Sequence, residues 1–90
     1  MEIDDKQKEL LGRLGSSFFT VKECAVILEV DEIEFTKEMK DSSSPCYKAY
    51  YSGFYTSKLK HREGVIEVSE RGSNPAQQMV EGYIKDASKP

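Results

Sequence analysis

The candidate functional residues of this chain are five basic residues and one threonine. Their side chains could contact the phosphates of DNA. Between Asp41 and Glu63 the sequence has no acidic residue, yet it holds four Lys or Arg residues among tyrosines. Such a stretch attracts a polyanion even though the net charge of the chain is -3. The residues predicted to bind DNA are Thr36, Lys37, Lys40, Lys48, Lys58 and Arg62.

Patterns typical of catalysis or metal binding are missing from the sequence. His61 is the single histidine, and no carboxylate or cysteine stands at the spacing of a triad or a ligand set. The serines at 42–44 lack the GxSxG setting of a nucleophile, and the glycines do not form a phosphate-binding loop. Cys24 and Cys46 are too few for a zinc site or a disulfide framework. We therefore expect no enzymatic activity, no metal and no cofactor.

The composition predicts one small domain, residues 1–90, with a highly charged surface. Charged residues make up 32% of the chain and hydrophobic residues 38%, which is typical of a folded globular protein. No apolar run is long enough to cross a bilayer. The first residues, MEIDDKQKELL, are acidic and amphipathic, whereas a secretion signal is basic and then continuously apolar. We expect a cytoplasmic protein without a membrane partner.

A helix-turn-helix over residues 20–40 is the element expected to position the first candidates. Thr20 and Glu23 have the spacing of a capping box, which marks the start of a helix. Asp31 and Glu34 have the same spacing, with Asp as the capping residue. The two helices are predicted over about 21–29 and 32–40.

The turn between these helices is short, and its key position is Glu29. Glycine is common there in helix-turn-helix motifs because it tolerates the backbone angles of a sharp corner. A plain helical hairpin is therefore the alternative. In a helix-turn-helix the start of the second helix would approach the bases, where Asp and Glu can accept from cytosine but repel phosphates. The residues expected in its core are Ala25, Leu28, Val30, Phe35 and Met39.

A supporting helix is expected before the motif, over about 4–14 and ending at Gly15. After the motif, the segment Asp41–Pro45 is the clearest break in the chain, with Pro at the first position of the next helix. The domain would then consist of an N-terminal part, residues 1–41, and a C-terminal part, residues 45–87.

The C-terminal part should contain a long helix and a short closing helix. Apolar residues at steps of three and four predict the long helix over about 45–71, either continuous or divided into two helices near Gly53 or Gly64. The closing helix, over about 75–86, should fold back as a hairpin. The fold class is therefore all-α, with four or five helices.

Tyrosines recur at four-residue steps along the expected long helix, at Tyr47, Tyr51 and Tyr55. Such rings could stack on bases, but at helical spacing they more often belong to a core or to a subunit interface. A small core cannot cover so many rings. We therefore expect a homo-oligomer with these three tyrosines at its interface.

The chain resembles the small terminase subunits of phages, which are DNA-packaging proteins, and related helix-turn-helix proteins. Three segments carry the resemblance and together cover most of the chain. They are FFTVKECAVILEVDEIEFTKEM at 18–39, SSSPCYKAYYSGFYTSK at 42–58 and VIEVSERGSNPAQQMVEGYIKD at 65–86.

The resemblance implies a non-enzymatic protein of phage or prophage origin that recognises duplex DNA. It also implies assembly into rings and a partner, the large packaging subunit with ATPase and nuclease activity.

The acidic N-terminal half supports a different interpretation: residues 1–45 hold six Lys or Arg against eleven Asp or Glu. The alternative is a protein-interaction module or a small transcriptional regulator whose helix-turn-helix binds DNA weakly.

Overall fold

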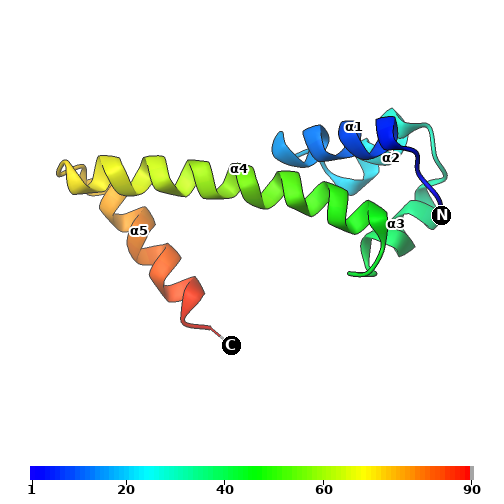
Figure 1. Ribbon diagram of the computed structural model, residues 1–90. Helices are drawn as coiled ribbons and strands as arrows, with labels where there is room; N and C mark the ends of the chain where they lie inside the picture. The colour runs from blue at the N-terminus through cyan, green and yellow to red at the C-terminus, as the bar shows by residue number, and fades with distance from the viewer. Residues whose placement is uncertain (90) are drawn as a thin grey trace. The chain divides into compact units, whose positions relative to one another are not determined.

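The computed structural model describes residues 1–89, which form five α-helices and contain no strand (Figure 1). The all-α fold expected from the sequence is therefore confirmed. Each helix lies close to its predicted position, and the long helix is continuous. The helices are α1 (Asp5–Ser16), α2 (Val21–Leu28), α3 (Glu32–Met39), α4 (Pro45–Glu70) and α5 (Asn74–Ala87).

Two compact units divide the chain, and the boundary between them falls inside α4. The first unit, Met1–Ser57, contains α1, α2, α3 and the first half of α4. The second unit, from Lys58 onward, contains the rest of α4 and α5. The break expected at residues 41–45 is the turn between α3 and α4, and it lies inside the first unit. That the chain folds as a single domain stays a prediction.

The hydrophobic core of the first unit is built from the apolar faces of α1, α2, α3 and the start of α4. Four of the five core residues expected in the helix-turn-helix are buried, while Val30 is half-buried against the core. Periodicity therefore predicted the buried faces of these short helices correctly. The buried residues are Leu11, Leu14, Cys24, Ala25, Leu28, Phe35, Met39, Cys46 and Tyr50.

The backbones of α1 and α4 approach so closely that only glycine fits between them. A Cβ atom on Gly15 would lie 2.0 Å from the carbonyl oxygen of Tyr50, and one on Gly53 would lie 2.0 Å from the carbonyl oxygen of Gly12. The expectation that Gly15 ends the first helix is wrong, because α1 continues to Ser16 and Gly15 is buried inside it. Gly53 likewise does not interrupt α4.

The predicted helix-turn-helix is formed by α2 and α3, and each of these helices has a capped start. The Thr20 hydroxyl accepts a hydrogen bond from the Glu23 amide at 3.1 Å, and the Glu23 carboxylate accepts from the Thr20 amide at 2.9 Å. The Asp31 carboxylate accepts from the Glu34 amide at 2.9 Å. Because these bonds satisfy amides that the first turn of a helix leaves unpaired, they fix where α2 and α3 begin.

The turn between α2 and α3 depends on a left-handed residue, Glu29, with φ 57° and ψ 43°. The Glu29 amide donates to the Val26 carbonyl at 3.1 Å, and the Val30 amide donates to the Ala25 carbonyl at 3.1 Å. This is the hydrogen-bond pattern of a Schellman cap, in which glycine is usual. The sharp corner is therefore made without glycine, at a steric cost from the Glu29 side chain.

We expect Glu29→Gly to raise the free energy of unfolding by about 0.5–1 kcal/mol. Glycine adopts the left-handed conformation without steric cost, which outweighs the extra freedom it gives the unfolded chain. Urea unfolding followed by circular dichroism measures the change. Glu29→Ala is the control, because it removes the same charge but keeps Cβ and should bring no gain. A Glu29→Gly variant that is less stable than Glu29→Ala would contradict this account of the turn.

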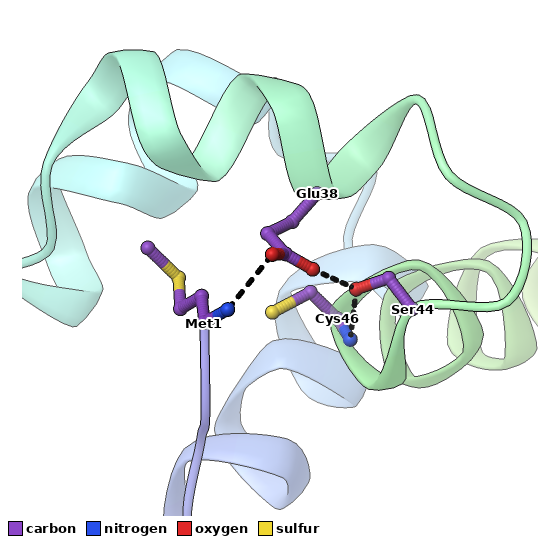
Figure 2. Close-up of polar contacts among 4 residues, drawn as sticks. All are labelled: Met1, Glu38, Ser44 and Cys46. Carbon is purple, nitrogen blue, oxygen red and sulfur yellow. Dashed lines mark hydrogen bonds and ion pairs between the residues drawn. The ribbon is translucent and has the colours of Figure 1, made fainter.

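A polar network ties the start of the chain to α3 and α4 (Figure 2). The Met1 ammonium group donates to one oxygen of the Glu38 carboxylate at 2.8 Å, and the Ser44 hydroxyl donates to the other at 2.6 Å. The Ser44 hydroxyl also accepts from the Cys46 amide at 3.2 Å, so it caps the start of α4. Ser44 is buried, and these bonds satisfy its hydroxyl within the core.

The network makes stability depend on pH at both ends of the neutral range. The hydrogen bond from the Met1 ammonium group, followed by that from Ser44, holds the pKa of Glu38 below its ordinary value of 4.5. The same contact raises the pKa of the Met1 amino group above its ordinary value of 8.0. The stabilisation from Glu38 is lost as the pH falls through the lowered pKa that this carboxyl has in the folded chain. The stabilisation from the Met1 amino group is lost as the pH rises through its raised pKa in the folded chain.

The difference in unfolding free energy between the wild type and Glu38→Gln should therefore be largest between about pH 5 and 8 and shrink on both sides. Urea unfolding at a series of pH values measures it. Glu32→Gln, on the same helix, is the control and should show no such window, because no hydrogen bond or ion pair engages the Glu32 side chain in the described chain. A difference for Glu38→Gln that is the same at every pH would refute the role of the network.

In the second unit α5 folds back on the end of α4 as the predicted hairpin. Gly72 has φ 97°, a conformation that side chains disfavour, and it ends α4. The Ser73 hydroxyl accepts from the Ala76 amide at 3.4 Å at the start of α5. The Gln77 side-chain amide donates to the Ser69 carbonyl at 3.2 Å and joins the two helices.

Candidate nucleic-acid interface

Three of the predicted DNA-binding residues belong to α3 or to its C-terminal cap. Lys37 and Lys40 are exposed at the end of the helix and lie three residues apart, so they share one side of it. Thr36 is half-buried, and its hydroxyl donates to the Glu32 carbonyl at 2.7 Å. The hydroxyl proton of Thr36 is therefore engaged inside the helix, and only its oxygen can accept from a ligand.

The acidic residues of α3 are less available than the sequence suggests. Asp31 caps the helix, and Glu38 is held in the polar network at the start of the chain. In residues 1–89 no hydrogen bond or ion pair engages the side chains of Glu32 and Glu34. The exposed surface of α3 thus carries the carboxylates of Asp31, Glu32 and Glu34 against two lysines, so it stays slightly acidic although Glu38 is paired with the Met1 ammonium group.

A groove of about 410 Å³ on the first unit brings Lys48 together with a residue that the sequence did not indicate. Lys8 of α1 and Lys48 of α4 both line this groove, which also holds the side chains of Ser43 and Ser52. Asp41 lies nearby, and hydrogen bonds from Ser43, together with the charge of Lys48, lower its pKa. The sequence alone could not place Lys8 in this site, because its position beside Lys48 depends on the packing of α1 against α4.

The other two predicted cations, Lys58 and Arg62, lie in the second unit. They are one turn apart on α4 and both are half-buried. The Arg62 guanidinium group lies over the Tyr83 ring, 4.2 Å from its centroid, which is a cation–π contact. Arg62 is thus engaged within its own hairpin.

The three predicted interface tyrosines form a ladder along α4. The ring centroids of Tyr47 and Tyr51 are 4.5 Å apart and those of Tyr51 and Tyr55 are 5.6 Å apart. Tyr47 and Tyr51 are half-buried, and Tyr55 is exposed. Tyr50 is the tyrosine that the core uses, since its hydroxyl donates to the Phe19 carbonyl at 2.6 Å. The role of the ladder in an oligomer stays a prediction.

Apolar side chains are also exposed on the helix-turn-helix. Val26 of α2 is 71% exposed and Ile33 of α3 is 69% exposed, while Ile27 is partly exposed. The start of α3 therefore presents an aliphatic side chain between the carboxylates of Glu32 and Glu34. A thymine methyl group or a protein partner could contact such a surface.

Both cysteines are buried as reduced thiols in the core of the first unit. Burial raises the pKa of Cys24 to about 11 and also raises that of Cys46, so neither is a reactive thiolate at neutral pH. In the part of the chain that the structure describes, no group of three or more His, Cys, Asp or Glu side chains could hold a metal ion. The cysteines therefore act as small core residues.

Comparison with known proteins adds no functional assignment. No helix among the described residues has the length and apolar character of a membrane span. No protein family, curated protein or solved structure matches the chain.

Proposed function

We propose that this chain is a non-enzymatic, DNA-binding helix-turn-helix protein that acts as an adaptor in the packaging of phage or prophage DNA. The observation that carries the proposal is the capped α2–turn–α3 motif, whose second helix leaves Lys37 and Lys40 exposed. The packaging role and the large ATPase and nuclease subunit as partner rest on the resemblance of three sequence segments to small terminase subunits. A cytoplasmic location follows from the same role.

In the proposed complex α3 enters the major groove, as second helices of such motifs do. Lys37 and Lys40 contact phosphates, and Glu32 at the start of α3 accepts from a cytosine amino group. Lys8 and Lys48 provide a second pair of phosphate contacts from the first unit. Lys58 and Arg62 add contacts from the second unit. Because most of these contacts are to phosphates, affinity should depend strongly on salt.

A second function is favoured by the exposed apolar residues of the motif. Val26 and Ile33 are the two most exposed large hydrophobic residues in the described chain, and both belong to the helix-turn-helix. If this surface binds a protein, the chain is an interaction module or a small transcriptional regulator with weak DNA binding. The salt dependence of DNA binding separates the two functions, because an interaction module gives no salt-dependent affinity to fit.

We expect Lys37→Glu to weaken binding to duplex DNA and to reduce the slope of log affinity against log salt by about one, because one phosphate contact is lost. Fluorescence anisotropy with a labelled duplex, between about 50 and 200 mM salt, measures both quantities. Lys85→Glu on α5 makes the same charge change outside the predicted site and should leave the slope unchanged. Equal effects of the two substitutions would show that only overall charge matters and would count against the proposal.

A further inference from the structure

The second unit has little hydrophobic core of its own. Of its described residues, 58–89, only Ala76 is buried. Two short helices that share so small a core are not stable by packing against each other alone. Large apolar side chains are instead exposed, and they are Leu59, Ile66, Val68, Met79 and Ile84. Such a surface is typical of a contact with another molecule.

One flank of this hairpin is hollowed into a groove of about 580 Å³ between α4 and α5. Val65 and Val68 line it from α4, and Pro75, Ala76 and Met79 line it from the start of α5. Lys60 and His61 border the same groove. Leu59 and Ile66 are not among the lining residues and lie on a different side of α4. The groove is therefore an apolar surface with a cationic end.

Gly64 also lines this groove, and no contact within its own chain requires a glycine at this position. Glycine disfavours a helix, yet a Cβ atom on Gly64 would meet no atom within 4 Å. Gly15 and Gly53 differ, because a neighbouring backbone occupies the place of their Cβ atoms. The open space at Gly64 would let the backbone of a second helix approach closely, as the backbones of α1 and α4 do at Gly53.

The charges of α4 in this unit are arranged to match a second copy of the same helix. Before Gly64 the helix carries basic residues, and after it the charged residues are acidic until Arg71. The basic residues are Lys58, Lys60 and Arg62, and the acidic residues nearest to Gly64 on its C-terminal side are Glu67 and Glu70, with Glu63 at the boundary. One oxygen of the exposed Glu67 carboxylate pairs with Arg71 of the same helix, which leaves the other oxygen for a partner. In an antiparallel pair that crosses at Gly64, the basic end of each copy meets the acidic end of the other. A symmetric dimer has this self-complementary form.

We propose that the groove of the second unit binds the same groove of a second copy of this chain, in an antiparallel dimer whose two α4 helices cross at Gly64. Val68 and Met79 of each copy are covered by the partner copy, and Lys60 of each lies near Glu67 of the other. This interface is distinct from the tyrosine ladder of the first unit. It goes beyond the proposed function, because it requires no DNA.

Analytical ultracentrifugation of the full chain over a range of concentrations tests the dimer. Val68→Asp should raise the dimer dissociation constant by about tenfold or more, because the two-fold axis buries two unpaired carboxylates. Ile66→Asp is the matched control, since Ile66 is an exposed aliphatic residue of the same helix that does not line the groove. Gly64→Leu should also break the dimer while leaving the helix content intact, because the added side chain has open space in the monomer.

Exchanging the charges of Lys60 and Glu67 tests whether the partner is a second copy of this chain. Lys60→Glu should weaken the dimer, and Lys60→Glu combined with Glu67→Lys should restore it, because the antiparallel contact is then rebuilt with the signs reversed. A wild-type chain that stays monomeric at millimolar concentration would overturn the proposal. So would a dimer that survives Val68→Asp and Gly64→Leu but is lost in Tyr55→Glu, because the interface would then be the tyrosine ladder. None of these results depends on DNA binding.

Discussion

Gly53→Ala is expected to lower the free energy of unfolding by about 3 kcal/mol, although alanine favours a helix over glycine. The added Cβ would lie 2.0 Å from the carbonyl oxygen of Gly12 and 3.1 Å from the amide nitrogen of Ser16. These are backbone atoms, which cannot rotate away as a side chain can. α1 and α4 must therefore separate, and the core between them loses contacts.

Urea unfolding measures this effect, and Gly12→Ala is its control at the same helix crossing. A Cβ on Gly12 would lie 3.5 Å from the Ala49 carbonyl oxygen, which is an ordinary contact. Gly12→Ala should therefore be neutral or stabilising by up to about 1 kcal/mol. If both variants are equally stable, α1 and α4 do not touch at Gly53 and the arrangement of the first unit is wrong.

Phe35→Ala is expected to cost about 3–5 kcal/mol and to abolish DNA binding. Phe35 is the largest completely buried side chain in the described chain, and it belongs to α3. Its removal leaves a cavity in the core that joins α3 to α1, α2 and α4. A domain of this size has a total stability of only about 5–13 kcal/mol, so the variant should be largely unfolded on mild heating.

Ile33→Ala is the control for Phe35→Ala, because Ile33 lies two residues away on the same helix and is 69% exposed. Its loss should change stability by less than about 0.5 kcal/mol. Thermal unfolding by circular dichroism and anisotropy with duplex DNA measure both variants. Equal destabilisation by the two substitutions would mean that α3 packs through a different face.

The sequence predicted the secondary structure of this chain well because the signals are local. Capping residues at Thr20, Asp31 and Ser73 define helix starts through bonds to amides three residues later, and Pro45 begins α4 where proline is tolerated. Apolar spacing identified the buried faces of the short helices α2 and α3, whereas in α4 the apolar residues Leu59 and Ile66 are exposed. Features that depend only on neighbours in the chain can be inferred without coordinates.

Long-range contacts were not predictable in the same way. Gly15 and Gly53 suggested a helix end and a helix break, and both instead lie where two helices touch. The pairing of Met1 with Glu38 and the position of Lys8 beside Lys48 depend on how α1 meets α3 and α4. The pairing of Glu38 with the Met1 ammonium group also offsets one negative charge of α3, which a residue count of that helix does not show.

The most direct test of the helix-turn-helix as a DNA-binding element is an NMR titration of the labelled chain with duplex DNA. We expect the largest shifts of backbone amides in α3, around Lys37 and Lys40, with smaller shifts near Lys8 and Lys48. Excess salt should reverse them, because phosphate contacts dominate the binding. Shifts confined to residues from Lys58 onward, or no shifts at all, would contradict the claim that α3 meets DNA.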